Sequence, residues 1–307
     1  MNGSSTRAPT FHAGEVALQT QVGVAERMAR VAPQMIRDHM PEQHRDFFPT
    51  LPFVIVGSVD PRGQPSASLV AAPPGFAWSP DPATLRIDAL PLAGDPLAQN
   101  LHAGAPLGLL GIRAHERRRN RLNGSVLERD DLGFSLRVGQ SFGNCPKYIH
   151  PREAFYVGAP PAPPVQEADR LGPRERALIA AADTFFIASA HPAALTSSMS
   201  SEGVDVSHRG GPAGFAAFSD DDTFVIADYR GNDLYMTLGN LQLSPLAGLL
   251  FIDRQRGDLL QLEVTTDLIS GAHPQSTSAD SGRLVRFRVQ RVRLFPATSA
   301  LRFGPEE

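Results

Sequence analysis

The pattern of apolar and polar positions predicts a helical layer at the start of the chain and strands after it. Residues 15–40 repeat apolar side chains at a loosely helical period, which Pro33 interrupts. Short apolar runs bounded by Gly, Pro and Asp follow, as is typical of strands joined by hairpins in an antiparallel sheet. They lie at residues 53–57, 66–70, 84–88 and 107–112, near residue 122, and at residues 134–138. We therefore expect a mainly β fold with flanking helices.

The order of these segments returns roughly 140 residues later, as in an internal repeat. The paired segments are 53–56 with 185–188, 84–88 with 223–228, Asn-Leu at 100–101 with Asn-Leu at 240–241, and 106–112 with 245–252. Chance similarity would not preserve this order. The sequence thus predicts two similar domains that pack about an approximate two-fold axis, as the subunits of a homodimer do.

A proline-rich stretch between the repeats marks the expected domain boundary. Residues 158–165 hold too many prolines for the interior of a sheet and are suited to an extended spacer. The sequence predicts a helical segment at 1–50, a first barrel at 51–157, a linker at 158–172, a second barrel at 173–296 and a tail at 297–307.

The composition is that of an ordinary globular chain. The formal net charge is -3 and 42% of the residues are hydrophobic, so nucleic acid is not an expected partner. The basic run at 115–121 is interpreted as a solvated hairpin or strand edge rather than as an anion site. No apolar run approaches the ~20 residues of a membrane span, and the polar start lacks the apolar core of a signal peptide. We expect no membrane partner and a cytoplasmic location.

The only lysine and the only cysteine of the chain lie in one segment, Asn-Cys-Pro-Lys-Tyr at 144–148. Arginine stands at every other Lys or Arg position, so Lys147 marks a place where a compact ammonium group is needed. The alternative is a surface lysine that survived by chance. Cys145 is interpreted as a small buried residue rather than a nucleophile, because no His or Asp partner is evident. No Cys or His spacing predicts a metal site.

Two segments of the second half, at 205–215 and 228–233, place Arg209 and Arg230 beside glycines. Arginine binds phosphate oxygens in a bidentate way, and glycine lets backbone N–H groups approach the same anion. Thr237, in a helix expected to begin near Asn232, adds a hydroxyl close to the positive helix N-terminus. Either segment alone fits an exposed turn, but the two together, with Lys147 in the other half, favour an anion site. Residues 90–94, the corresponding turn of the first half, lack Arg and Asn, so one of two equivalent sites is expected to be lost.

Several motifs together resemble a bacterial branch of the FMN-binding split barrels related to pyridoxamine 5'-phosphate oxidase. They are Phe-His-Ala-Gly-Glu at 11–15 with Gln19 and Gly23, Phe-Gly-Asn-Cys-Pro-Lys-Tyr-Ile at 142–149, Asp-Val-Ser-His-Arg-Gly-Gly at 205–211, and Arg-Gly-Asn at 230–232 followed by Asn240. The resemblance covers about residues 11–295 and implies two tandem six-stranded split barrels that form an intramolecular pseudo-dimer, with FMN in the cleft between them.

Carried onto this chain, the resemblance implies roles for individual residues. Lys147 and Tyr148 are the candidate catalytic residues and arrive from the first half. The candidate cofactor-binding residues are Ser207, His208, Arg209, Arg230, Gly231, Asn232, Thr237, Asn240 and Lys147. Two departures concern His208, at a position often occupied by lysine, and Gln-Leu-Glu at 261–263, which replaces an arginine-containing strand that survives in the first half at Arg121.

The function that the resemblance implies is an FMN-dependent oxidoreductase acting on a small molecule, with NADH or NADPH as a candidate electron donor. Tyr229 or Trp78 is expected to flank the flavin ring or the substrate. The alternative is a non-catalytic binder or carrier of flavin, of another phosphorylated ligand or of a tetrapyrrole. We expect the chain to be a monomeric pseudo-dimer or to form a homodimer.

Overall fold

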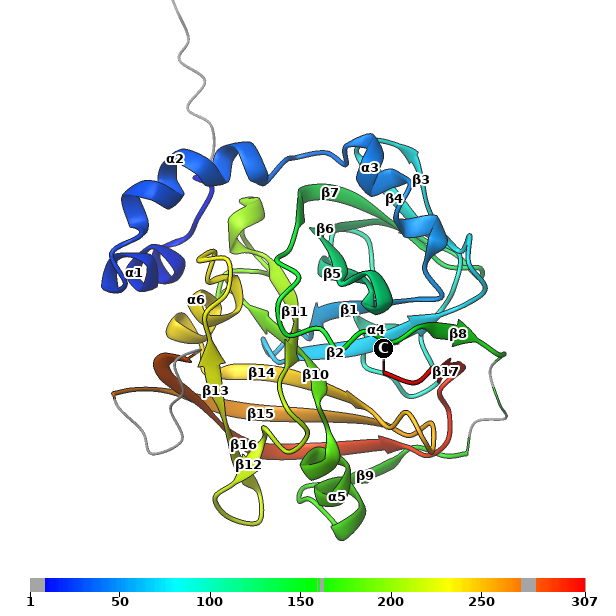
Figure 1. Ribbon diagram of the computed structural model, residues 1–307. Helices are drawn as coiled ribbons and strands as arrows, with labels where there is room; N and C mark the ends of the chain where they lie inside the picture. The colour runs from blue at the N-terminus through cyan, green and yellow to red at the C-terminus, as the bar shows by residue number, and fades with distance from the viewer. Residues whose placement is uncertain (1–8, 159, 161–162, 272–279, 307) are drawn as a thin grey trace, which may run out of the picture.

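Two large antiparallel sheets dominate the protein (Figure 1). The computed structural model describes residues 9–158, 160, 163–271 and 280–306. The first sheet has the strand order β2-β1-β5-β6-β7-β4-β3. Its strands are β1 (Phe53–Val59), β2 (Pro65–Ala71), β3 (Ala77–Asp81), β4 (Thr84–Ile87), β5 (Pro106–Arg113), β6 (Arg118–Arg129) and β7 (Phe134–Gly143).

The second sheet repeats the first strand for strand. Its order is β11-β10-β14-β15-β16-β13-β12, and β9 adds to β16. The strands are β9 (Gln166–Ala168), β10 (Thr184–Ala190), β11 (Val204–Gly210), β12 (Ala217–Phe218), β13 (Thr223–Tyr229), β14 (Leu246–Ile252), β15 (Leu259–Ser270) and β16 (Asp280–Phe295). The predicted mainly β fold with two similar halves is confirmed.

Helices cover the sheets at matching places. A short helix lies between the fourth and fifth strands of each half, and each places an asparagine against a serine of the first strand. Asn100 donates to Ser58 Oγ at 2.9 Å, and Asn240 donates to Ser189 Oγ at 3.1 Å. The helices are α1 (Ala13–Gln21), α2 (Ala25–Met35), α3 (Glu42–Arg45), α4 (Leu97–Asn100), α5 (Pro173–Ala181) and α6 (Met236–Leu243), with short 3-10 turns at η1 (Phe48–Thr50), η2 (Ala114–Glu116) and η3 (Ser200–Glu202).

The residue registers identify equivalent positions in the two halves. Val56 in β1 pairs with Ser68 and Leu109, and Ile187 in β10 pairs with Ser207 and Leu249. Ser68 and Ser207 are therefore equivalent. The same alignment pairs Arg121, opposite Leu110 in β5, with Gln261, opposite Leu250 in β14. These equivalences relate the functional residues below to their counterparts.

The halves contact each other through equivalent glycines. A Cβ on Gly108 in β5 would lie 2.8 Å from Val204 O of β11, and a Cβ on Gly248 in β14 would lie 2.4 Å from Pro65 O of β2. The reciprocal approach, first half onto second and second onto first, is what an approximate two-fold axis produces. An apolar cluster shared by both halves fills this interface and includes Ile55, Leu110, Val206 and Leu250.

We expect Gly248→Ala to destabilise the protein by at least about 1–3 kcal/mol, because the methyl group would force apart two backbones that cannot yield as a side chain does. Guanidinium unfolding gives the free energy. Gly231→Ala is the control, since no atom lies within 4 Å of its added Cβ. Equal stability of the two variants would contradict the close approach of the halves.

Several local features differ from the sequence pattern. Strand β3 was not predicted, and Pro33 lies inside α2. The helix expected to begin near Asn232 begins at Met236, because Asp233 and Tyr235 have left-handed backbones with φ of 61° and 59°. The domain boundaries stay a prediction. Residues 1–8, 159, 161–162 and 307 of the expected terminal and linker parts lie outside the described residues.

Two further pairings cross the expected boundaries. The segment expected as a linker contributes β9, which pairs with β16, and the segment expected as a tail contributes β17 (Leu301–Phe303). Strand β17 pairs with β8 (Ala154–Tyr156), at the end of the first half. Among the described residues, no helix combines the length and the apolar character that crossing a membrane requires.

Candidate functional site

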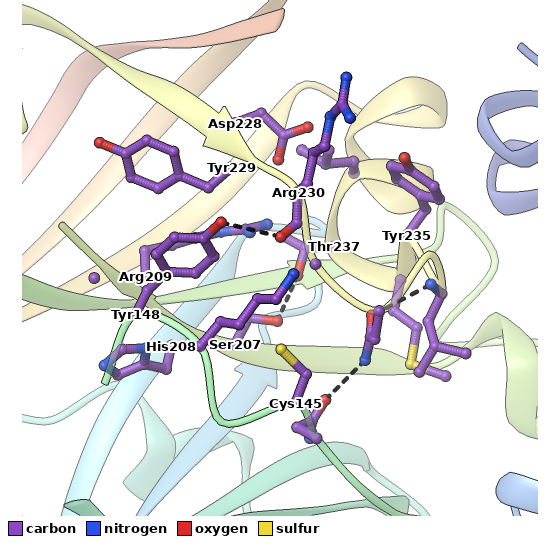
Figure 2. A pocket seen from close by; sticks show the side chains of 18 of the residues that line it. Cys145, Tyr148, Ser207, His208, Arg209, Asp228, Tyr229, Arg230, Tyr235 and Thr237 are labelled. Atoms are coloured by element: carbon purple, nitrogen blue, oxygen red, sulfur yellow. Dashed lines mark hydrogen bonds between the residues drawn. The ribbon is translucent and has the colours of Figure 1, made fainter. Parts of the chain in front are cut away.

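A pocket between the halves contains nearly all of the predicted site residues. Strand β6 and the segment 144–148 of the first half form one side, and β11 with the turn between β13 and α6 of the second half forms the other (Figure 2). The predicted residues that line it are Lys147, Tyr148, Ser207, His208, Arg209, Arg230, Gly231, Asn232 and Thr237. Residues far apart in the sequence thus meet at one place.

Two predicted residues lie elsewhere. Asn240 does not line this pocket; its buried side chain joins α6 to β10 through Ser189, just as Asn100 does in the first half. The matching pair indicates a structural role. Trp78 is 41% exposed in β3, where its Nε1 donates to Asp88 at 2.7 Å. Of the two rings expected to flank a flavin, only Tyr229 lines the pocket.

A buried ion pair that the sequence did not predict supports the inner wall: Arg121 lines the pocket, and its partner Asp205 lies directly behind it. Arg121 Nη1 lies 2.6 Å from Asp205 Oδ1, and both side chains are buried. Arg121 Nη2 also donates to Ser207 Oγ at 2.6 Å, and Thr237 Oγ1 donates to Asp205 Oδ2 at 2.7 Å. Burial lowers the pKa of Arg121, and the Asp205 charge opposes this effect. The Ser207 and Thr237 hydroxyls are therefore already bound within the wall.

The interpretation of the basic run at 115–121 as surface is wrong for two of its members. Arg119 and Arg121 are two positions apart in β6, so their side chains point to the same face of the sheet. Both line the pocket. Arg119 donates to the Cys145 carbonyl and, at 3.2 Å, to His208 Nδ1. Burial and the neighbouring Arg121 charge lower the pKa of Arg119 to about 10. The spacing of two within a strand was the signal that could have identified these residues.

His208 is kept neutral by its surroundings. Burial, and then the charges of Arg119 and Arg209, lower the pKa of His208 well below its ordinary value. Its Nδ1 accepts from Arg119, which places the proton of the neutral ring on Nε2. His208 therefore does not supply the positive charge that a lysine would supply at this position.

The remaining cations of the pocket have no anionic partner among the residues that the structure describes. The described part of the chain offers no ion pair or hydrogen bond to the side-chain nitrogens of Lys147, Arg209 or Arg230. The carboxylates of the pocket are occupied by other arginines: Asp205 by Arg121, Asp228 by Arg283 at 3.3 Å, and Asp233 by Arg27. The pocket therefore presents a surplus of positive charge.

Aromatic and amide groups complete the pocket. The Tyr148 and Tyr229 rings stack with centroids 4.9 Å apart, and Tyr148 Oη donates to Arg230 O at 3.1 Å, so the stack joins the two halves (Figure 2). Tyr148 has a left-handed backbone with φ of 62°, as the turn at 144–148 requires. Asn144 accepts from Asn232 at 3.4 Å, while its own Nδ2 is buried without a partner.

Helix α1 supports the turn that carries Arg230 and Asn232. His12 caps the helix, its Nδ1 accepting from Gly14 N at 3.1 Å while Glu15 accepts from the His12 N–H. Gln19 then donates to Leu234 O at 3.3 Å. The N-terminal motif thus contributes to the site by holding the turn between β13 and α6.

The equivalent place in the other half is filled by protein. Gln261 occupies the position of Arg121 and donates to Asp95 Oδ2 at 2.7 Å, and Ser68 Oγ donates to Asp95 Oδ1 at 2.6 Å. Asp95 is buried, and burial raises its pKa to about 6 despite these hydrogen bonds. The arginine strand of the first half completes the second-half pocket across the interface. In the second half, residues 261–263 stand where the first half has this arginine strand. The loss of arginine there therefore changes the place around Asp95 and leaves the pocket around Arg209 and Arg230 complete.

Comparisons with known proteins gave structural matches only. No family model and no curated protein matches the sequence. One matched structure is a protein of the pyridoxinephosphate oxidase family from Clostridium acetobutylicum, with 9% identity and a TM-score of 0.30, covering 40% of this chain and 86% of that chain.

Two others are an FMN-binding protein from Syntrophomonas wolfei and HutZ, the heme storage protein from Vibrio cholerae. The first has 11% identity and a TM-score of 0.27, covering 39% of this chain and 88% of its own. The second has 10% identity and a TM-score of 0.27, covering 42% of this chain and 97% of its own. The chain is thus similar, over 39–42% of its length, to each of these proteins.

Proposed function

We propose that the protein is an FMN-dependent oxidoreductase that binds one flavin in the pocket between its halves. The observation that carries this proposal is the convergence of Lys147, Arg209 and Arg230, none of which has an anionic partner among the described residues, on one pocket. Cations held close together repel one another, and a phosphorylated ligand would relieve this repulsion. The buried, unpaired Nδ2 of Asn144 provides a further donor for such a ligand.

The site residues divide into a cationic end, which would bind the phosphate, and a neutral end. Arg209 and Arg230 would hold the phosphate, with Asn232 and Asn144 donating to oxygens beside it. The wall formed by Arg121 and Asp205 carries no net charge, so it suits the hydroxyl-bearing chain of FMN better than the phosphate. This placement revises the phosphate role expected for Ser207 and Thr237, whose hydroxyls are bound to Asp205 and to each other.

The bound flavin would supply the hydride chemistry, and the protein would supply binding, orientation and charge. Lys147 places a positive group in the pocket from the first half, where it would stabilise a negatively charged, reduced ring. The flat Tyr148 and Tyr229 rings offer a surface for a ring system. Lys147 and Tyr148 therefore remain the proposed catalytic residues, and a small molecule is the proposed substrate.

Titrating the purified chain with FMN tests this proposal. We expect flavin fluorescence to change until about one FMN per chain has bound, because the equivalent place is filled by Gln261 and Asp95. Anaerobic addition of NADH or NADPH should then bleach the flavin absorption. A bound flavin that neither donor reduces would favour a carrier instead. Absence of FMN binding would contradict the proposal.

A further inference from the structure

A second cavity shares His208 with the first pocket and is otherwise lined by different residues. It measures about 60 Å³, and its wall is mostly apolar. The apolar lining comes from both halves and from β17: Phe53, Ile112, Ala114, Ile149, Phe186, Ile252 and Phe303. The polar lining is concentrated in His150, Arg152 and Arg254, with Thr184 and His208. The cavity therefore has an apolar part and a cationic end.

Two of these lining side chains, His150 and Arg152, bind a carboxylate of the chain itself, that of Glu306, which lies beside the cavity and does not line it. Glu306 Oε1 lies 2.7 Å from His150 Nδ1, and Glu306 Oε2 accepts from Arg152. His150 Nε2 lies 2.7 Å from Gly211 O. Glu306 is 46% exposed, so a ligand in solution competes with it directly.

A second carboxylate is fixed in place beside the first. The Asp183 side chain is 5% exposed and receives two hydrogen bonds of 2.7 Å from Arg254. Arg152 Nη1 lies 2.9 Å from Asp183 Oδ2. Burial alone would raise the pKa of Asp183, but Arg254, Arg152 and His150 lower it to about 2. Asp183 thus neutralises one arginine permanently, whereas Glu306 is the exchangeable partner of His150 and Arg152.

The same side chains are the one group of possible metal ligands found among the described residues. His150, Asp183 and Glu306 place their ligand atoms within 4.8 Å of one another. Both carboxylates, however, are already bound by arginine, and both His150 nitrogens lie 2.7 Å from a protein oxygen. A cation would have to displace these guanidinium groups. The cluster therefore favours an anion.

We propose that this cavity binds a small apolar monocarboxylate, whose carboxylate replaces that of Glu306 on His150 and Arg152 while its hydrocarbon tail enters the apolar part. At about 30 Å³ per water-sized group, a cavity of about 60 Å³ holds about two carbons. The tail of propionate has this length, and butyrate has one further carbon, which would lie between the cavity and the carboxylate. The proposal does not depend on flavin binding.

Calorimetric titration of the purified chain with butyrate tests the proposal. Glu306→Gln removes the competing charge and should raise the affinity about tenfold or more. Arg152→Gln should lower the affinity at least about tenfold, because a charge-assisted hydrogen bond is lost. Ala114→Leu fills the apolar part and should abolish binding. Uncharged butyramide should not bind to any variant.

Three outcomes would overturn the proposal: no butyrate binding to the wild type or to Glu306→Gln, equal affinity in these two proteins, or affinity unchanged by Ala114→Leu. The last outcome would show that butyrate only forms an ion pair at the surface and that its tail does not enter the cavity. Circular dichroism of each variant checks folding. FMN affinity measured on Ala114→Leu should equal that of the wild type, so a failure here is separable from a failure of the flavin site.

Discussion

Replacing Arg121 with Met is expected to lower the free energy of unfolding by about 3–5 kcal/mol, because it leaves Asp205 as an unpaired buried charge. Arg121 also donates to Ser207 Oγ at 2.6 Å, so a second buried group loses a partner. Guanidinium unfolding of the ligand-free chain at pH 7 measures the effect. Absence of ligand keeps the result independent of the proposed function.

The double variant Arg121→Met/Asp205→Asn should recover most of this loss, since it removes the buried charge together with its partner. Gln261→Met is the matched control at the equivalent position. It should cost only about 1–3 kcal/mol, because Asp95 keeps its hydrogen bonds from Ser68 and from the Leu97 N–H. If the single and double variants were equally unstable, the ion pair would not be the cause.

The largest expected effect on ligand binding is that of Arg209→Met combined with Arg230→Met. Each arginine would contribute a charge-assisted hydrogen bond to phosphate worth about 1.5–3 kcal/mol, so the double variant should bind FMN at least about 100-fold more weakly. Fluorescence titration at low and high salt measures the loss. The salt dependence should also become shallower, because the charges of Arg230, which is exposed, and Arg209, which is partly exposed, are gone.

Leu92→Ala provides the control, because Leu92 lies in the equivalent turn of the first half, where the equivalent place is filled. FMN affinity should not change in this variant. Lys147→Arg tests the remaining cation: charge is kept, but the longer planar group cannot occupy the same point, so affinity or reduction rate should fall. Wild-type binding by the double arginine variant would place the anion elsewhere.

The repeat and the grouping of the site residues could be predicted from the sequence, because both depend on local patterns. Strand runs and turn residues recur in the same order, and Arg209 and Arg230 each stand beside a glycine, Arg209 near the end of β11 and Arg230 in the turn after β13. Asn240 was assigned to the ligand because it follows Arg-Gly-Asn. The repeat already paired Asn240 with Asn100, but only the structure shows that each asparagine donates to a serine and so holds helix to strand.

The wall of Arg121 and Asp205 could not be predicted in the same way, because its members come from different halves and pair only after the halves pack. A basic run is usually solvated, and only the direction of β6 turns Arg119 and Arg121 inward. Likewise, nothing local indicates that Thr237 donates to Asp205. Contacts across the two-fold interface depend on the relative placement of the domains, which periodicity does not encode.

The interlocking of the halves has a consequence for how such a protein can evolve. In a homodimer one gene encodes both copies of every residue, so a substitution that closes one site closes the other. Joining the copies in one chain removes this constraint. Arg121 and its equivalent, Gln261, have diverged, and so have Asp205 and Ser66. One place was thus free to become a buried hydrogen-bonded core that stabilises the interface, while its counterpart kept an open pocket under separate selection.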